Sequence, residues 1–313
     1  MITSLDGILD AIREHPRQTV AVAVAAQASV VEAVKTARDR DIAGAVLVGD
    51  RAEIERLCEQ AGLSGDGVEI VDEPDDLKAA RTACLTVREG RADILMKGHI
   101  HTDDFLRALL SRETGLRTDT IMSHVFILET TRRGKLTLVT DAAMNIAPDL
   151  EGKAEIILNA VYLANCLGID DPKVGVLAAT EQVNPKMQAT LDAAALHAME
   201  HRNQFPTCRV DGPLALDNAV SVDAAREKKI PGDVAGDCDI LVCPNIEAGN
   251  ILAKSFVFLG GGRLAGVLVG ASAPVVLTSR ADSAEAKMYS IAAAVLMAGL
   301  QRTGRLKIGR VHF

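Results

Sequence analysis

Tryptophan is absent from the sequence, and aromatic residues make up only 3% of its 313 residues. Valine, isoleucine, leucine and alanine must therefore fill the core, and a bound adenine ring is not expected to stack on an aromatic side chain. Hydrophobic residues make up 48% of the chain and charged residues 24%, a balance typical of a soluble globular protein with a sizeable core. The length is sufficient for one large domain or two ordinary ones.

The sequence also lacks an excess of positively charged residues. The formal net charge is −8, and residues of both signs are mixed along the chain. Nucleic-acid binding needs a basic face, so we expect no nucleic-acid partner. The charge balance does not exclude an anionic small substrate, because a local cluster of arginine side chains and helix N-termini can hold one.

The sequence contains no apolar run that approaches the roughly 18–20 residues of a membrane span. Residues 1–17 are polar and predict a first helix rather than a signal peptide. The six cysteines include no C-x-x-C pair, which favours free, buried thiols in a reducing compartment. We therefore expect a cytoplasmic protein without a membrane partner. The cysteines are Cys58, Cys84, Cys166, Cys208, Cys238 and Cys243.

The first third of the chain alternates short apolar runs with amphipathic stretches. Continuous apolar strands that alternate with helices predict a parallel sheet covered on both faces. The predicted strands are Val20–Ala25, Ala45–Val48, Val68–Val71 and Asp93–Met96. The predicted helices are Ser29–Asp39, Arg51–Gln60, Asp75–Glu89 and Thr102–Leu110.

The middle of the chain has a different pattern. Two apolar runs, Ile121–Leu128 and Leu136–Val139, flank a short turn and predict an antiparallel hairpin. A long helix is predicted from Glu151 to about Leu167 because its apolar residues fall on one stripe. The later elements alternate again. They are the strands Val174–Ala178, Asp239–Cys243, Leu264–Gly270 and Pro274–Leu277, and the helices Pro185–Glu200, about Glu247 onward and Ser283–Leu300.

These patterns predict an α/β fold with two lobes, each a mostly parallel sheet covered by helices. The change of character lies near residues 115–135. The last helix is nearly all apolar, so we expect it to be buried and to return to the first lobe. The predicted first lobe comprises residues 1–120 and 290–313, and the second comprises residues 121–289.

A corner between two apolar segments near the end of the chain carries unusual charges. The strand that includes Val275 is followed by Ser279, Arg280 and Asp282 before the last helix begins. In open α/β sheets, ligands bind beyond the carboxyl ends of strands, where helix N-termini present free N–H groups. Asp282 and Glu285 are spaced almost as in a capping box, so a purely structural role is the alternative for these carboxylates. That alternative does not account for an arginine beside a buried corner.

A second strand-to-helix turn occupies Met96–Phe105 and contains Lys97, His99 and His101. The histidines are expected to be wall or hinge residues rather than metal ligands, because no third ligand is nearby. A third turn follows a predicted strand and contains Asp141 and Asn145. These two residues are either ordinary turn formers or part of a ligand crevice.

A fourth candidate stretch lies at the helix predicted from about Glu247. Glu247, Asn250 and Lys254 fall on one helix face, and Asn245 stands just before them. A solvated face with an ion pair is the alternative. Gly249 argues against that alternative, because glycine lowers helix stability by about 1 kcal/mol relative to alanine and indicates close approach of another backbone or a ligand.

Two further motifs are expected to have no catalytic role. His197–His201 matches the H-x-x-E-H pattern of some zinc proteases, but it lies at a helix end and no third ligand follows, so we expect no metal site. Leu259–Gly266 is rich in glycine but lacks the spacing of a phosphate-binding loop, so a tight turn is predicted. No G-x-G-x-x-G opens the first strand–helix unit, which leaves a dinucleotide site unsupported.

Taken together, these stretches resemble the phosphate acetyltransferase and phosphate butyryltransferase family, over roughly residues 90–300 and in the family's order. The details lean towards the butyryl branch, notably in "LTSRADSAEAKMYS". The similar stretches are "ADILMKGHIHTDDFLRALL", "VTDAAMNIAPDLEGKAEIILNA", "VDGPLALDNAVS", "VAGDCDILVCPNIEAGNILAKS" and "VVLTSRADSAEAKMYSIA".

The resemblance implies transfer of an acyl group from acyl-CoA to orthophosphate, with acyl-CoA as a substrate and no tightly bound cofactor. It also implies a two-lobed fold like that of the isocitrate and isopropylmalate dehydrogenases, an active site in the cleft and a homodimer or larger homo-oligomer. In the acetyl branch the matching serine and arginine are catalytic, which points to Ser279 and Arg280. The acetyl branch has a catalytic aspartate where this chain has Ala286, so Glu285 and Asp282 are the candidate acid/base groups.

The remaining polar residues of the similar stretches are candidates for substrate binding: Lys97, His99, Asp141, Asn145, Asn245, Asn250 and Lys254. Two other functions stay open from the sequence. One is a metal- and NAD-dependent decarboxylating dehydrogenase of the same fold, although its clustered aspartates and nicotinamide site cannot be assembled here. The other is a non-catalytic acyl-CoA-binding protein, which the replacement at Ala286 allows.

Overall fold

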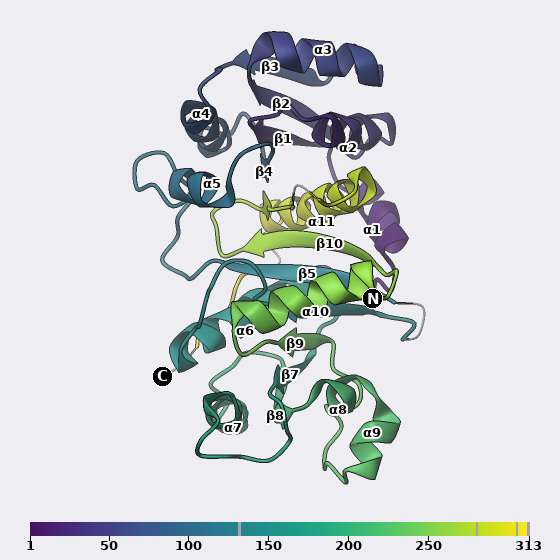
Figure 1. Ribbon diagram of the computed structural model, residues 1–313, viewed down its shortest axis with the longest axis vertical. Helices are drawn as coiled ribbons and strands as arrows, with labels where there is room; N and C mark the ends of the chain where they lie inside the picture. The colour runs from purple at the N-terminus through teal and green to yellow at the C-terminus, as the bar shows by residue number, and fades with distance from the viewer. Residues whose placement is uncertain (131–132, 280, 305, 312–313) are drawn as a thin grey trace. The chain divides into compact units, whose positions relative to one another are not determined.

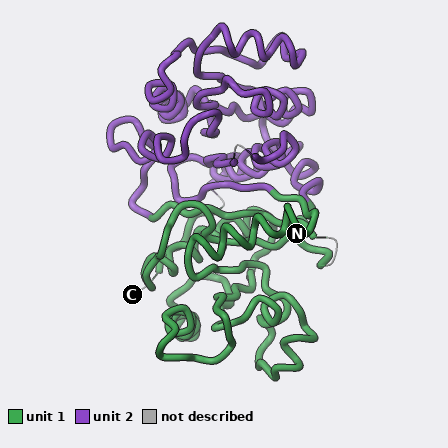
Figure 2. Tube along the Cα trace, viewed as in Figure 1, with its two compact units in different colours: residues 1–4, 121–264, 306–313 green, residues 5–120, 265–305 purple. Residues whose placement is uncertain are grey.

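The computed structural model describes residues 1–130, 133–279, 281–304 and 306–311. Its fold is a mixed α/β fold with mostly parallel strands and helices, as the alternating pattern predicts. The chain divides into two compact units (Figure 2). Unit 1 comprises residues 1–4, 121–264 and 306–313, and unit 2 comprises residues 5–120 and 265–305. The lobe boundaries expected from the sequence stay a prediction.

The strands of unit 2 follow the order β3-β2-β1-β4-β11-β10. All neighbours in this order pair in parallel except β10 and β11, which are antiparallel. The strands from β1 to β4 are those expected from the apolar runs. Their bounds are β1 Gln18–Ala23, β2 Ala43–Gly49, β3 Val68–Asp72, β4 Ile94–Lys97, β10 Arg263–Val269 and β11 Val275–Val276.

Helices cover both faces of these strands (Figure 1), with α4 and α5 packed together on one side and α2 and α11 on the other. Helix α11 is buried from Lys287 to Gly299 and also packs against α1, so the apolar last helix does return to the N-terminal part of the chain. The helices are α1 Leu5–Ala11, α2 Ala28–Asp39, α3 Arg51–Ala61, α4 Asp76–Arg88, α5 Thr102–Leu109 and α11 Ala284–Arg302.

Local sequence signals set both ends of α3 and the start of α4. The Asp50 and Asp75 side chains accept the N–H groups of Glu53 and Lys78 and so cap α3 and α4. Gly62 ends α3 in the left-handed conformation, with φ of 68°, which glycine adopts at no steric cost. These signals explain why the predicted bounds of α3 and α4 agree with the structure within one residue.

Unit 1 contains strands in the order β5-β6-β9-β7-β8. Strands β5 and β6 form the predicted antiparallel hairpin, with Phe126 opposite Val139, and the other neighbours pair in parallel. Helices α6 and α10 both pack against this hairpin. The strands are β5 Ser123–Glu129, β6 Leu136–Thr140, β7 Lys173–Leu177, β8 Arg209–Leu214 and β9 Ile240–Val242. The helices are α6 Leu150–Cys166, α7 Gln188–His201, α8 Leu216–Val220, α9 Val222–Glu227 and α10 Ile246–Phe258.

The structure of unit 1 differs from the sequence prediction at α7 and β8 and in the short helices α8 and α9, which the sequence pattern does not predict. Helix α7 begins at Gln188 rather than at Pro185, because the Thr190 hydroxyl and the backbone of Asn184 exchange hydrogen bonds that hold a turn there. Strand β8 was not predicted. It contains a Gly212–Pro213 pair, which the sequence pattern disfavours inside a strand, and β8 lies at the end of the strand order, where proline is tolerated.

All six cysteines are free and buried, as the sequence predicts. Burial raises the pKa of the thiols of Cys84, Cys166, Cys208, Cys238 and Cys243 to about 12, and it also raises the pKa of Cys58. Thiols in this state are poor nucleophiles at neutral pH. No helix among the described residues is both long and apolar enough to cross a bilayer.

A buried ion pair joins α6 to α7. The Lys153 ammonium lies 2.5 Å from a carboxylate oxygen of Asp192, and both side chains are almost fully buried. The amide of Gln188 donates to the other oxygen of Asp192 at 2.8 Å. Two buried charges are tolerated here because each compensates the other, so the loss of one partner is expected to be costly.

We expect Lys153→Met to lower the free energy of unfolding by about 3–5 kcal/mol, since it leaves the Asp192 charge buried and unpaired. The double variant Lys153→Met/Asp192→Leu should recover most of this loss, because it removes both charges. Urea denaturation of the two variants and the parent measures the effect. A double variant as unstable as the single one would contradict this account of the pair.

Candidate functional site

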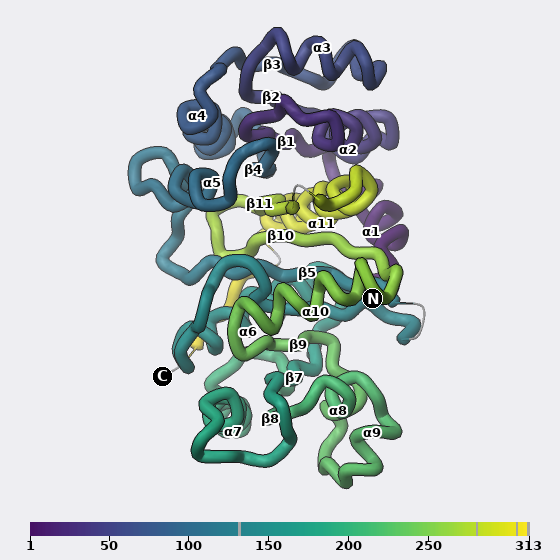
Figure 3. Tube along the Cα trace, in the orientation of Figure 1, coloured from purple at the N-terminus to yellow at the C-terminus, as the bar shows by residue number. Residues whose placement is uncertain are grey.

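Two of the candidate stretches meet at one edge of the unit 2 sheet. Strands β4 and β11 pair in parallel, with Val276 opposite Met96, so their carboxyl ends lie side by side (Figure 3). Lys97 ends β4, and Ser279 follows β11 after two buried residues. The carboxyl edge of a parallel sheet is where open α/β proteins bind ligands.

The turn after β11 is held by its own polar groups. The Ser279 N–H donates to the Asp282 carboxylate at 2.7 Å, and the Ala281 N–H donates to the Ser279 hydroxyl at 3.3 Å. Ser283 caps α11 by accepting the Ala286 N–H at 3.1 Å. Ser279 and Glu285 are exposed, whereas Arg280 lies outside the described residues.

Hydrogen bonds hold the turn after β4 against the end of β1. The N–H groups of Gly98 and His99 donate to the carbonyls of Ala23 and Val24 at 2.9 and 2.7 Å. A Cβ at Gly98 would lie 2.2 Å from the Val24 carbonyl oxygen, so only glycine fits. This close packing buries the Lys97 side chain, whose ammonium donates to the Gly98 carbonyl at 3.4 Å, and leaves His99 exposed.

The loop after β6 in unit 1 is organised by Asp141, which is 3% exposed. One carboxylate oxygen accepts the N–H groups of Ala143 and Met144 at 2.9 and 3.0 Å. The other accepts the N–H of Asn145 at 3.1 Å and its side-chain amide at 2.6 Å. The Asn145 amide also donates to the Met122 carbonyl at 2.8 Å. In this structure, Asp141 and Asn145 shape the loop.

Helix α10 packs against the same loop, which brings the third and fourth candidate stretches together. Asn245 caps the helix by accepting the Ala248 N–H at 2.9 Å, and the Asn250 amide donates to the Ala142 carbonyl at 3.1 Å. Lys254 is exposed, one turn beyond Asn250. The side-chain hydrogen bonds of the asparagines thus hold backbone in place, and their roles in substrate binding stay predictions.

Gly249 permits this packing. A Cβ at that position would lie 2.4 Å from the Asp141 carbonyl oxygen and 3.0 Å from the Ala142 Cα. The close backbone approach expected from the sequence is therefore the reason for glycine inside this helix. The candidate residues thus form two sets. Unit 2 holds Lys97, His99, Ser279, Asp282 and Glu285, and unit 1 holds Asp141, Asn145, Asn245, Asn250 and Lys254.

Lys287, in the first turns of α11, was not among the site residues expected from the sequence. Its side chain is 1% exposed, and its ammonium donates to the Asp282 carbonyl. Burial lowers the pKa of Lys287, although the Asp282 carboxylate nearby opposes that shift. A charged residue inside an otherwise apolar helix was the sequence signal that could have identified it.

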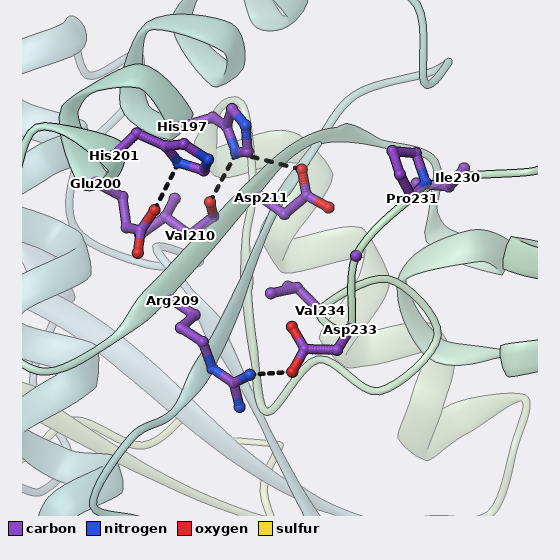
Figure 4. A pocket seen from close by; sticks show the side chains of 11 residues that line it. His197, Glu200, His201, Arg209, Val210, Asp211, Ile230, Pro231, Asp233 and Val234 are labelled. Carbon is purple, nitrogen blue, oxygen red and sulfur yellow. Dashed lines mark hydrogen bonds and ion pairs between the residues drawn. The ribbon is translucent and has the colours of Figure 1, made fainter.

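The two histidines of the H-x-x-E-H motif line a cavity of about 360 Å³ along α7 and β8 (Figure 4). The Nδ1 atom of His197 lies 2.9 Å from the Val210 carbonyl oxygen, and that of His201 lies 2.8 Å from the Glu200 carboxylate. No cluster of three metal-ligating side chains occurs in the part of the chain that the structure describes. The cavity also lies near the amino end of β8, whereas the candidate stretches follow carboxyl ends of strands.

The glycine-rich stretch is a turn, as predicted. Gly260, Gly261 and Gly262 connect α10 to β10, and Gly261 has a φ of 64°. A strand follows this turn, and a phosphate-binding loop would instead lead into a helix.

Comparison with known proteins gives a consistent result. A family model described as phosphate acetyl/butaryl transferase matches residues 76–295. The chain is 48% identical to a phosphate butyryltransferase of Clostridium acetobutylicum, over 96% of this chain and 99% of that protein. It is 40% identical to a phosphate acetyltransferase of Rhizobium meliloti, over 96% and 95% respectively. The crystal structure of a branched-chain phosphotransacylase from Enterococcus faecalis V583 superposes with a TM-score of 0.80 at 36% identity, over 90% and 99%.

We expect Gly249→Ala to lower the free energy of unfolding by about 1–3 kcal/mol, because the new methyl group would overlap the Asp141 carbonyl. At a solvent-exposed helix position the same substitution has the opposite effect, because alanine there stabilises the helix by about 1 kcal/mol relative to glycine. The matched control is Glu247→Ala, an exposed position on the same helix, which should change stability by less than about 1 kcal/mol. A Gly249→Ala protein that is more stable than the parent would contradict the close approach.

Proposed function

Because this chain belongs to the phosphate acetyl/butaryl transferase family, we propose that it transfers a short-chain acyl group from acyl-CoA to orthophosphate. The products are an acyl phosphate and free CoA. The observation that carries the proposal is the 48% identity to a phosphate butyryltransferase over nearly the full length of both chains.

The preferred acyl group is proposed to be butyryl or one of similar size. Three relatives named as phosphate butyryltransferases, one of them as probable, are 46–48% identical to this chain. The relatives named as phosphate acetyltransferases are 37–43% identical. The similar Enterococcus protein is named as a branched-chain phosphotransacylase, which fits an acyl group larger than acetyl.

The proposed reaction is a direct displacement. An oxygen of phosphate forms a bond to the acyl carbon, the carbon–sulfur bond breaks, and CoA leaves as a thiolate that then takes up a proton. Binding both substrates side by side supplies the orientation, so no covalent acyl-enzyme is required. In the reverse direction a thiol with a pKa near 8.5 must lose its proton, which calls for a carboxylate nearby.

The turn after β11 is proposed to bind the phosphate. Ser279 is exposed at the carboxyl edge of the sheet, in the turn that leads to the N-terminus of α11 at Ala284, where the helix dipole favours an anion. Arg280, for which the family resemblance is the support, would bind two phosphate oxygens in a fork. The same groups can stabilise the negative charge that develops on the thioester oxygen.

The two candidate carboxylates are proposed to have different roles. The Asp282 carboxylate accepts the Ser279 N–H, so its contact supports a role in shaping the turn. Glu285 is exposed in the first turn of α11, which supports a role in proton transfer. Lys97 and His99, at the adjacent strand end, are proposed to contact the substrates. Asp141, Asn145, Asn245, Asn250 and Lys254 are proposed to form the part of the binding site that unit 1 contributes.

A two-lobed architecture like that of the isocitrate and isopropylmalate dehydrogenases belongs to the same proposal. So do a cytoplasmic location and the absence of a tightly bound cofactor. We also propose that the enzyme is a homodimer. Helix α10 is rich in apolar residues, yet only Gly249 and Ala253 are buried in it. Ile251, Phe258 and Leu259 are 66%, 67% and 87% exposed, which supports a second copy covering this face.

We expect phosphate-dependent thiol release from butyryl-CoA, and less from acetyl-CoA. Release would be followed with a thiol reagent, with propionyl-CoA as the intermediate length and with phosphate omitted as the blank. The protein's own thiols should contribute little, because they are buried and their pKa values are raised. Absence of phosphate-dependent release from all three thioesters would refute the proposed activity.

Removal of the Arg280 guanidinium should lower turnover in the thiol-release assay while the protein stays folded. We expect Arg280→Ala to lower turnover by about two to three orders of magnitude, as the loss of a charge-stabilising donor does in other enzymes. The matched control is Arg81→Ala, an exposed arginine on α4, which should keep parental turnover. Parental turnover in Arg280→Ala would exclude this side chain from the mechanism.

We expect Phe258→Glu to shift the protein from dimer to monomer in sedimentation velocity, because it places a charge in the apolar face of α10. Leu77→Glu is the matched control, since Leu77 is also a large exposed apolar residue, on α4. A parent protein that sediments as a monomer, or a Phe258→Glu variant that remains dimeric, would argue against this interface.

A further inference from the structure

The buried Lys287 ammonium stands in an environment unfavourable to a cation. Its side chain is 1% exposed, and its hydrogen-bond acceptor among the described residues is the neutral carbonyl of Asp282. The other buried lysine on a helix, Lys153, has an ion pair with a carboxylate at 2.5 Å. No such ion pair forms at Lys287 among the described residues. An ammonium group has three donor hydrogens, so capacity remains for further acceptors.

The position of Lys287 on α11 adds a second cost. Helix α11 begins at Ala284, so Lys287 lies in its first turn, at the positive end of the helix dipole. A side chain on a helix points back towards the N-terminus, and the bond to Asp282, which precedes the helix, places the ammonium there. Burial and the dipole both disfavour a cation, and an anion bound at the start of α11 would offset both.

The contacts of Lys287 connect it to Ser279. Its ammonium holds the carbonyl of Asp282, and the carboxylate of the same residue accepts the Ser279 N–H at 2.7 Å. The Asp282 N–H in turn donates to the Ser279 carbonyl at 3.2 Å. The Lys287 N–H donates to the Ser283 carbonyl at 3.1 Å. Lys287 therefore holds Asp282, which contacts Ser279 through both its carboxylate and its N–H.

We propose that Lys287 is a positioning residue for phosphate: it holds Asp282 in contact with Ser279, the residue proposed to bind the anion, and adds positive charge to the start of α11. This inference rests on the proposed phosphate acyltransferase function, which assigns phosphate to the same turn. Most of the acyl-CoA contacts are proposed to come from other residues, so we expect the effect of Lys287 on binding to fall mainly on phosphate.

The test compares Lys287→Met, which removes the charge at similar size, with Lys287→Arg, which keeps it. KM values for phosphate and for butyryl-CoA are measured separately by thiol release, each at saturating concentration of the other substrate. We expect Lys287→Met to raise the KM for phosphate about tenfold to a hundredfold, the effect of losing an interaction with a charged group. The KM for butyryl-CoA should stay within about twofold, and Lys287→Arg should restore most of the phosphate affinity.

Ser290→Ala is the matched control for simple loss of stability. Ser290 is a fully buried polar residue on the same helix, and its hydroxyl accepts the Gly266 N–H at 2.9 Å. Removal of the Ser290 hydroxyl should lower the melting temperature without changing the ratio of the two KM values. Equal rises of both KM values in Lys287→Met, or a phosphate KM within about twofold of the parent, would overturn the inference.

Calorimetry with inorganic phosphate alone separates this inference from the proposed function. We expect the parent protein to bind phosphate and Lys287→Met to bind it about tenfold or more weakly. A parent protein that releases no thiol yet binds phosphate through Lys287 would refute the acyl transfer and keep the positioning role. Equal phosphate binding by parent and variant would refute the role. If Lys287→Met does not fold, Lys287→Gln, which keeps a donor but not the charge, carries the same test.

Discussion

The parallel pairing of β4 with β11 is the constraint on which the candidate site of unit 2 depends. It brings the turn after Lys97 beside the turn that carries Ser279, although about 180 residues separate them in the sequence. The register with Val276 opposite Met96 makes the two strands end at one edge. Both strands are buried, so a shift of the register would expose apolar residues and is disfavoured. Core packing thereby fixes the positions of the exposed Ser279 and His99 as well as that of the buried Lys97.

Glycines determine how closely the turns approach their neighbours. At Gly98 a side chain would overlap the Val24 carbonyl, and at Gly249 it would overlap the Asp141 carbonyl. At both positions, two backbone segments pack directly against each other with no side chain between them. Such contacts leave little freedom for the adjoining polar residues, including Lys97 and Asn250, and precise placement is what a binding site requires. The two glycines belong to different units, so a close backbone contact permitted by glycine occurs in each unit.

Much of the fold could be predicted from the sequence, because apolar strands, capping residues and glycine stops are local signals. Strand β8 could not, since its Gly212–Pro213 pair contradicts local strand preference and only its place at the end of the strand order permits it. Three candidate stretches are predicted as strand-end turns and the fourth as part of a helix, and the structure places them so. The partners of Asn250 and Asn145 were beyond prediction, because these amides bind carbonyls 108 and 23 residues away. The burial of Lys287 likewise depends on tertiary packing.

The start of α11 has an alanine at position 286 and a buried lysine at position 287. By the resemblance to the acetyl branch, Ala286 stands where a catalytic aspartate would be, and the next residue is the buried Lys287. Lys287 makes this helix end more positive, and under the proposed function this would favour the phosphate dianion. In the proposed reaction, proton removal would then fall to Asp282 or Glu285. Asp282 accepts the Ser279 N–H, and Glu285 is exposed in the first turn of the helix, which is why the proposal assigns proton transfer to Glu285.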